Sequence, residues 1–367
     1  MTRRPAWDTR VIDGVVDRGW LPDPVLRAVI RLLLVRRRSQ ITAGGLEARS
    51  ERTRQLIEQL AAGPVTLAAD AANEQHYEVP TAWFRTVLGP HLKYSSGWWP
   101  PGVDDLATAE AAMLRLTAER ARIEDGQRIL ELGCGWGSLT LWLAEHYPTA
   151  RIVGVSNSAT QRRHIEAEAA RRGLSNLTVL TGDVGVLGTG GGPGGTDGQY
   201  AEVVRDGAFD RVVSVELFEH VRNHRELTHR IARWLVPGGM LFVHLFAHRS
   251  DPYVFASGVR ADWMARNFFT GGIMPSHDLL ARTVKDLVLD DQWAVSGQHY
   301  ARTLRAWLER IDANREPLLE VLAGDGPRAA RARLHRWRVF TIACEELFAF
   351  ADGDEWHVSH HRFRRRD

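Results

Sequence analysis

The sequence predicts an α/β protein with a doubly wound, parallel central sheet and a helical extension before it. Three observations support this prediction. Between residues 128 and 246, short apolar runs alternate with helical segments. The first apolar run ends in a glycine-rich turn that opens a helix. The 367 residues are 44% hydrophobic and 25% charged, which indicates a globular chain of about two domains and excludes a disordered or fibrous one.

The predicted helical extension covers residues 1–70. Its segment from Leu26 to Leu34 interleaves apolar residues with Arg27 and Arg31, and three more arginines follow at 36–38. This pattern has two interpretations: a basic amphipathic helix on a membrane surface, or a helix packed on the rest of the protein with its arginines in water. We favour the packed helix. Since no run of about eighteen apolar residues occurs, no membrane span is expected.

The predicted core covers residues 71–250. Its expected strands lie at 128–133, 152–155, 177–181, 209–215 and 240–246, and its expected helices at 138–146, 159–172 and 225–235. The last helix is expected to stop at Pro237-Gly238-Gly239. Strands that alternate with helices imply a parallel sheet with helices on both of its faces.

Two regions differ in character from this core. Residues 185–207 are rich in glycine and are expected to form a surface loop. Residues 251–367 are rich in aromatic residues and histidine, and we expect them to form a C-terminal substrate cap with helices at Thr303–Asn314 and Arg331–Phe350. The basic tail, Arg362–Arg366, is expected to lie in solvent.

Composition excludes several classes of protein. Lys+Arg is 47 and Asp+Glu is 45, and this net charge of +2 argues against nucleic acid as a partner. Two cysteines, Cys134 and Cys344, are too few for a disulfide scaffold. With no recognisable secretory signal either, we expect a cytoplasmic protein. The fifteen histidines occur without cysteine pairs or a His-Glu-x-x-His pattern, so no metal site is expected.

The glycine-rich turn, Glu131-Leu-Gly133-Cys-Gly135-Trp-Gly137, is the first chemical motif. Its glycines permit a tight turn and a close approach of the backbone to a ligand. A dinucleotide site would need G-x-G-x-x-G and an acidic residue about twenty positions later. Position 138 is serine, and the second predicted strand ends in Val155-Ser156. The turn instead resembles motif I of the S-adenosylmethionine-dependent methyltransferases, which implies a Rossmann-like class I methyltransferase sheet.

Further motifs narrow the resemblance, which covers roughly residues 20–365. The chain is similar to the cyclopropane-fatty-acid synthase superfamily at Ala72–Tyr77, Leu92–Trp99 and Val215–Val221. It resembles the coclaurine N-methyltransferase branch of that superfamily at Leu241–His248, Asp262–Ser276 and His299–Thr303. The resemblance implies S-adenosyl-L-methionine as the cofactor.

The resemblance also implies the residues that hold this cofactor. Those expected at its amino-acid end are Tyr94 and Ser95, with Glu131, Gly133, Gly135 and Gly137 of the glycine-rich turn. Ser156 and Gln161 match the positions that hold the ribose hydroxyls, and Asp183 matches the position near the adenine. Two simpler interpretations stay open: Gln161 as an exposed helix residue, and Asp183 as a turn residue.

The candidate catalytic cluster contains Glu216, Glu219 and His220. Glu216 ends the fourth predicted strand, at the carboxyl edge where doubly wound sheets bind ligands, and the other two follow within one turn. By resemblance to the N-methyltransferase branch, these residues handle the substrate amine. A carboxylate or a neutral imidazole can take a proton from an ammonium group, and a carboxylate also stabilises positive charge. Helix N-capping is the simpler interpretation for Glu216.

The cyclopropane-forming branch uses a bound bicarbonate to remove a proton. By resemblance, Glu219, His244 and Tyr300 match three residues of its bicarbonate pocket, whereas the cysteine position of that pocket is Ser96. A hydroxyl can still hydrogen-bond an anion. Bicarbonate as a second cofactor therefore stays open, although the serine argues against cyclopropanation.

The sequence contains thirteen tryptophans, an unusually high number for a chain of this length. Within or beside the motifs lie Trp98, Trp99, Trp263, Phe268 and Phe269. Aromatic faces suit a flat amine or a cationic product, and they equally suit a hydrophobic core or a lid.

We therefore expect methylation of a small or amphipathic amine. The first alternative is C-methylation or cyclopropanation of an unsaturated lipid chain, with peripheral membrane contact through the N-terminal helix. From a different class, the chain could bind the cofactor without catalysis. The sequence identifies neither the methyl acceptor nor the oligomeric state, and it leaves a homodimer open.

Overall fold

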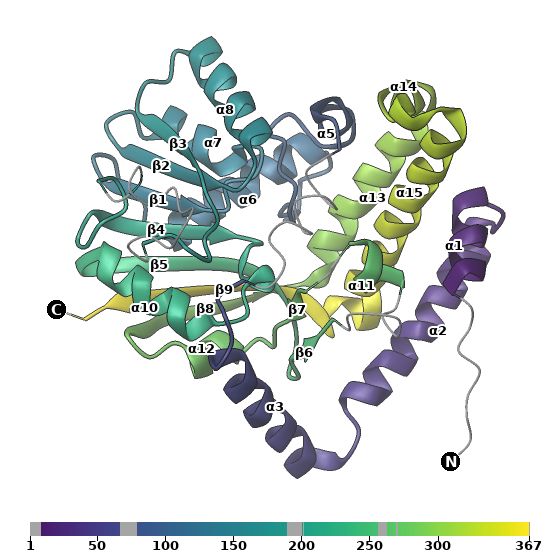
Figure 1. Ribbon diagram of the computed structural model, residues 1–367, viewed down its shortest axis with the longest axis horizontal. Helices are drawn as coiled ribbons and strands as arrows, with labels where there is room; N and C mark the ends of the chain where they lie inside the picture. The colour runs from purple at the N-terminus through teal and green to yellow at the C-terminus, as the bar shows by residue number, and fades with distance from the viewer. Residues whose placement is uncertain are drawn as a thin grey trace.

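A computed structural model describes residues 9–66, 79–188, 200, 202–255, 263–268 and 271–366 (Figure 1). Outside these ranges lie the motif at 72–77, most of the predicted glycine-rich loop, and Phe269. One seven-stranded sheet forms the centre, and long helices stand beside it at one end (Figure 1).

The strand order of this sheet is β3-β2-β1-β4-β5-β9-β8. Its strands are β1 (Arg128–Leu132), β2 (Arg151–Ser156), β3 (Leu177–Thr181), β4 (Phe209–Val215), β5 (Leu235–His248), β8 (Leu287–Val295) and β9 (Trp356–Arg365). The strands from β3 to β5 are parallel, and β9 and β8 are antiparallel to their neighbours. A small second sheet pairs β6 (Tyr253–Val254) with β7 (Ile273–Met274). The predicted doubly wound parallel sheet is confirmed from β3 to β5. Successive strands are added on one side of β1 up to β3 and on the other side from β4 onward.

Helices cover both faces of the sheet (Figure 1). Those before β1 are α1 (Thr9–Arg18), α2 (Asp23–Ile41), α3 (Gly45–Ala61), α5 (Thr81–Val87) and α6 (Leu106–Arg120). Those between the strands are α7 (Ser138–His146), α8 (Ala159–Arg172), α10 (His224–Trp234), α11 (Trp263–Asn267) and α12 (Leu279–Thr283). Those before β9 are α13 (Gly297–Ala313), α14 (Arg315–Val321) and α15 (Pro327–Ala349). Within the described ranges, no helix combines the length and the apolar character that a membrane crossing requires.

The predicted helix 225–235 is confirmed as α10 (His224–Trp234), whereas the strand predicted at 240–246 begins five residues earlier than expected. Helix α10 already ends at Trp234, and β5 runs from Leu235 through the Pro-Gly-Gly segment. The pairing of β5 with β4 shifts register there, between Phe209 and Arg211 of β4. Proline and glycine are tolerated at such an irregularity because an inserted residue leaves the hydrogen-bond ladder locally unpaired.

The solvent-exposed tail predicted at 362–366 is also wrong. Residues 356–365 form β9, which lies inside the sheet between β5 and β8. Arg362 is only 5% exposed, and its Nε donates a hydrogen bond of 2.5 Å to Asp290. The sequence analysis missed β9 because histidine, serine and arginine fill five of its buried positions and leave only Trp356, Val358 and Phe363 as a scattered apolar signal.

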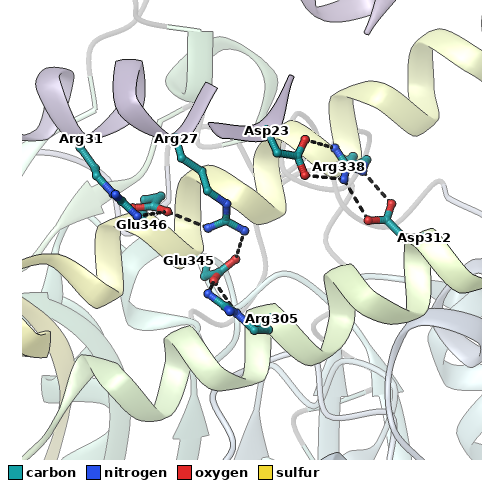
Figure 2. Close-up of polar contacts among 8 residues, drawn as sticks. All are labelled: Asp23, Arg27, Arg31, Arg305, Asp312, Arg338, Glu345 and Glu346. Carbon is teal, nitrogen blue, oxygen red and sulfur yellow. Dashed lines mark hydrogen bonds and ion pairs between the residues drawn. The ribbon is translucent and has the colours of Figure 1, made fainter. Parts of the chain in front are cut away.

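The packed interpretation of the N-terminal helix is confirmed. Leu26 and Ile30 of α2 are buried against Leu308 of α13 and Ile342 of α15. The arginines of this face are not simply in water: Arg27 donates hydrogen bonds of 2.7 Å to both Glu345 and Glu346 of α15, as Figure 2 shows. The same pairing of charges continues around this interface, with Arg31 on Glu346, Arg305 on Glu345, and Arg338 between Asp23 and Asp312 (Figure 2).

We predict that Arg27→Met lowers the free energy of unfolding by about 1–3 kcal/mol, between the values for exposed and buried ion pairs. The side chain of Arg27 is 19% exposed and those of Glu345 and Glu346 are 3% and 5% exposed, so the substitution leaves buried carboxylates with fewer partners. Urea unfolding measures the loss. Arg36→Met removes an exposed charge from the same helix and should change stability by less than about 0.5 kcal/mol.

Candidate active site

The glycine-rich turn follows β1 and leads into α7. Gly133, Gly135 and Gly137 all have positive φ, at 78°, 52° and 81°. A Cβ on Gly137 would lie 2.6 Å from Ile165, and one on Gly133 would lie 3.1 Å from Leu217. At Gly135 a Cβ would meet no atom within 4 Å. Packing therefore requires glycine at the two outer positions, whereas Gly135 faces open space that can admit a ligand.

Glu131 lies inside β1 and is 2% exposed. Its carboxylate accepts a hydrogen bond from Thr140 of α7. Burial raises its pKa to about 7, although Thr140 and Lys93 act in the opposite direction. The side chain thus ties the first strand to the first helix of the turn, and its contact with a cofactor stays a prediction.

Unpaired buried polar atoms gather where β1, β2 and β3 end. The Ser156 hydroxyl donates to Gln161 Oε1 at 2.7 Å, and Gln161 Nε2 has no hydrogen-bond partner among the described residues. The same is true of Ser138 Oγ and Thr181 Oγ1. Buried polar groups without partners are rare in proteins and call for a partner such as a ligand or a water molecule. This donor set fits the hydroxyls of an adenosyl group, and the prediction that Gln161 is exposed is wrong, since it is 1% exposed.

Asp183 is half-buried after β3. Its carboxylate accepts hydrogen bonds from the Gly185 backbone N–H at 2.8 Å and from the Thr66 hydroxyl at 3.2 Å. These contacts are those of a turn residue, and a role near the adenine stays a prediction.

We predict that Gln161→Met weakens the binding of S-adenosylhomocysteine about tenfold, the cost of one hydrogen bond to a buried donor. Methionine keeps the length and volume of the side chain but removes the unpaired Nε2 donor. Isothermal titration calorimetry measures the affinity. Gln40→Met, on the exposed side of α2, is the matched control and should leave the affinity unchanged.

Lys93, Tyr94 and Ser95 lie on the segment that faces the end of β4. The Tyr94 ring stacks on Trp307, with centroids 5.5 Å apart, and the Ser95 hydroxyl accepts a hydrogen bond from Lys93 Nζ. Lys93 is 2% exposed, and burial lowers its pKa to about 8 against the opposing charges of Glu216, Glu110 and Glu131. The sequence analysis gave this lysine no role, although it lies within the motif Leu92–Trp99 and the chain contains only one other lysine.

Glu216 lies at the centre of the site. It has a φ of 49°, an uncommon conformation for glutamate, and its side chain is 10% exposed. Glu216 Oε1 is 3.1 Å from the donating backbone N of Ser96 and 3.3 Å from His244 Nε2. Glu216 Oε2 accepts a hydrogen bond of 2.6 Å from the Tyr300 hydroxyl. Three donors from three segments thus converge on one carboxylate.

Thr303 holds the Ser96 segment in place. Its hydroxyl oxygen accepts hydrogen bonds from the Gly97 backbone N–H at 3.0 Å and from Trp99 Nε1 at 2.9 Å. Since Thr303 and Tyr300 lie one turn apart on α13, a single helix positions two of the three groups around Glu216.

Glu219 and His220 follow in a short 3-10 turn, Phe218–His220. Glu219 is 1% exposed; its Oε1 accepts a hydrogen bond of 2.7 Å from the Phe246 backbone N–H, and its Oε2 has no partner among the described residues. Burial raises the pKa of both carboxyl groups, and the charge of Glu216 raises that of Glu219 further. Lys93, Tyr300, the Ser96 N–H and His220 all favour the charged form of Glu216. Of the two, Glu216 is therefore the more readily ionised and Glu219 the more readily protonated.

The residues that matched a bicarbonate pocket are only partly brought together. His244 and Tyr300 contact Glu216, whereas Glu219 bonds to the backbone of β5. The Ser96 hydroxyl donates to the Gly97 carbonyl oxygen at 2.9 Å, so its backbone N–H rather than its side chain faces the carboxylate. The Glu216 carboxylate thus lies between His244 and Tyr300.

Comparison with known proteins places this geometry in a family. Residues 66–185 and 196–358 match the sequence profile described as mycolic acid cyclopropane synthetase, and residues 130–241 match that of a methyltransferase domain. The (S)-coclaurine N-methyltransferase of Thalictrum flavum subsp. glaucum is 32% identical over 96% of this chain and 94% of that enzyme. The cyclopropane-fatty-acyl-phospholipid synthase of Escherichia coli K12 is 29% identical, over 65% of this chain and 56% of that enzyme.

Solved structures of related proteins support the same family assignment. A crystal structure of coclaurine N-methyltransferase bound to N-methylheliamine and S-adenosylhomocysteine superposes with a TM-score of 0.89 and 29% identity, covering 98% of this chain and all of that one. The cyclopropane synthase MmaA2 from Mycobacterium tuberculosis shares the fold, with a TM-score of 0.64 and 20% identity. The chain therefore belongs to the mycolic acid cyclopropane synthetase family, and it is a methyltransferase that uses S-adenosylmethionine.

Proposed function

We propose that this enzyme methylates the nitrogen of a small or amphipathic amine. The observation that carries the proposal is the position of the Glu216 carboxylate, which takes three hydrogen bonds at the carboxyl edge of β4. An ionised carboxylate there attracts an ammonium group and can accept its proton.

S-adenosylmethionine, when bound, supplies a methyl group on a sulfonium sulfur. The acceptor nitrogen must present a lone pair, because the N–C bond forms as the C–S bond breaks. Glu216 takes the proton of the incoming ammonium group, and His220 beside it is half-buried and relays this proton toward solvent. Protonated Glu219 can donate a hydrogen bond but carries no charge, so we assign it to holding the acceptor rather than to deprotonating it.

Aromatic side chains are available to line the binding site of such an amine acceptor. Trp99, Phe268 and Tyr300 belong to one buried cluster, and Trp98 and Trp263 pack against it half-buried. The indole N–H of Trp263 is buried without a hydrogen-bond partner among the described residues, which suits a ligand acceptor atom beside it. Phe268 stacks on Phe340 with centroids 4.1 Å apart, so we assign this ring to the core. A methylated, cationic product would be held by cation–π attraction, worth about 0.5–2 kcal/mol at each ring.

One observation favours the lipid alternative. On α2, Val25, Val29, Leu32 and Leu33 are exposed, with exposed fractions of 45–69%, and basic residues 36–38 follow on the same helix. This combination suits peripheral contact with an anionic membrane. If a lipid chain were the substrate, activity should depend on anionic vesicles and fall when residues 36–38 are changed to glutamine.

The deciding experiment offers two acceptor pools to the purified enzyme with methyl-labelled S-adenosylmethionine. One pool contains cyclic and aliphatic amines, and the other contains vesicles of unsaturated anionic phospholipid. Mass spectrometry is expected to show one labelled methyl group on an amine and no change when vesicles are added. A labelled methylene or methyl group on an acyl chain, lost when residues 36–38 are neutralised, would show that the lipid reading is right.

A further inference from the structure

A chain of hydrogen bonds runs from Glu216 across three neighbouring strands to helix α6. Glu216 Oε1 is 3.3 Å from His244 Nε2, His244 Nδ1 is 2.9 Å from His360 Nε2, and His360 Nδ1 is 2.7 Å from the Arg120 guanidinium. His244 on β5 and His360 on β9 are register partners, so their side chains share one face of the sheet. Both histidines are fully buried, with 0% exposure.

Arg120, at the end of this hydrogen-bond chain, determines which atom of each histidine donates and which accepts. A guanidinium can only donate hydrogen bonds, so His360 Nδ1 must be an acceptor. Burial, together with the nearby charges of Lys93 and Arg120, lowers the pKa of His244 and of His360, and both rings are neutral. A neutral imidazole carries one N–H, which for His360 must then be on Nε2 and must point to His244 Nδ1. The proton of His244 is therefore on Nε2 and points to Glu216.

We propose that Arg120 and His360 are positioning residues, which polarise His244 as a permanent donor and so hold Glu216 ionised and correctly oriented for its amine substrate. The inference rests on the proposed function in one respect, that Glu216 acts as the charged acceptor. This hydrogen-bond chain cannot carry the substrate's proton away, because Arg120, His360 and His244 each already donate a hydrogen bond toward Glu216. That proton leaves on the side of His220.

Arg120 is itself held firmly. Its guanidinium lies 4.8 Å from the centre of the Trp293 ring, and its backbone carbonyl oxygen accepts a hydrogen bond of 2.8 Å from Arg362. Arg362 in turn lies over the ring of Trp293, at 5.1 Å from its centroid, and pairs with Asp290. Arg120, where the hydrogen-bond chain starts, is thus held in place by residues of β8 and β9.

Loss of the guanidinium should be visible at Glu216. Among the described residues, the other charged or titratable groups near Glu216 are Lys93, Glu219, His220, Tyr300 and Cys344, and those near His360 are Lys93, His244 and His361. None of them replaces a donor at His360 Nδ1. Without Arg120, both rings can reverse their tautomers, which presents a lone pair to the carboxylate and favours protonation of Glu216. The acid limb of the rate profile then moves to higher pH.

The first test is nitrogen NMR of the enzyme labelled with ¹⁵N-histidine, which needs no substrate. His244 and His360 are assigned by single substitution, His244→Gln and His360→Gln. Both rings are expected as neutral tautomers with the proton on Nε2. A proton on Nδ1 of either ring in the wild type would overturn the proposal while leaving the proposed amine methylation untouched.

The second test compares pH–rate profiles of kcat for Arg120→Met, Arg120→Lys and Arg122→Met. Arg120→Met is expected to raise the apparent pKa of the acid limb by about one unit and to lower kcat about tenfold below it. Arg120→Lys keeps a donor-only cation and should restore most of the profile. Arg122→Met removes an exposed charge two residues away and should leave the profile unchanged. A wild-type profile in Arg120→Met, or a shift of equal size in the Arg122 control, would overturn the proposal.

Discussion

Replacing Glu216 with glutamine is expected to lower kcat for methyl transfer by about 10³-fold while the affinity for S-adenosylhomocysteine stays unchanged. Glutamine keeps the shape of the side chain but removes the negative charge that Tyr300, His244 and the Ser96 N–H stabilise. Its amide nitrogen would also face a donor. Single-turnover transfer of labelled methyl groups measures the chemical step, and calorimetry measures the affinity.

The neighbouring carboxyl group provides the matched comparison. Burial and the charge of Glu216 raise the pKa of Glu219 well above its usual value, so we expect Glu219→Gln to exchange one neutral group for another. We expect a loss of only about tenfold, the scale of one hydrogen bond. Equal losses in the two variants would contradict the assignment of the charge to Glu216.

A third variant tests whether the three donors form an anion site. Glycine tolerates the φ of 49° at position 216, so Glu216→Gly should fold normally and open the space between Ser96, His244 and Tyr300. Added formate is expected to restore part of the activity of Glu216→Gly but none of the activity of Glu216→Gln. Failure of formate in both variants, at concentrations that saturate other anion sites, would argue against the anion site.

The largest expected effect on stability comes from Gly297→Ala. Gly297 is the first residue of α13, the helix that carries Tyr300. A Cβ at this position would lie 2.3 Å from the carbonyl oxygens of both Phe348 and Trp356. Both are backbone atoms, which cannot move aside as a flexible side chain can. We expect the free energy of unfolding to fall by about 2–4 kcal/mol.

Gly324→Ala is the control for this substitution. Gly324 lies in a helical turn, and a Cβ there would meet no atom within 4 Å. This change should be neutral or should stabilise the protein by about 0.4–1 kcal/mol, because alanine restricts the unfolded chain. Thermal and urea unfolding compare the two variants. Similar midpoints for both would show that the contacts around Gly297 relax without cost.

Local patterns in the sequence determined the parallel half of the sheet. The bounds of α7, α8, β3 and β4 agree with those predicted from apolar runs and helical segments. Helix α8 illustrates why: Ser158 caps its start by accepting a hydrogen bond from the Gln161 backbone, and Gly173 ends it at a φ of 70°. Such capping signals lie within a few residues of the helix end that they mark, so the sequence predicts the helix ends without knowledge of the fold.

The sequence also predicted where Glu216 lies, because the carboxyl ends of parallel strands meet at one edge of a sheet. The resemblance predicted His244 and Tyr300 as further members of the site, but it paired them with Glu219. Buried side chains choose their partners by distance in space, and the donors of Glu216 come from positions 28, 84 and 120 residues away in the chain.

Only the tertiary structure shows that Lys93, Arg120 and His360 lie near Glu216. Arg120 and His360 are 240 residues apart, and they meet because β9 inserts beside β5 in one particular register. A shift of one residue in that register would turn His360 to the other face of the sheet and break the chain to Glu216. The sequence by itself thus determined the local elements and the glycine-rich turn, whereas the partners and the ionisation of Glu216 depend on long-range packing and burial that no local pattern encodes.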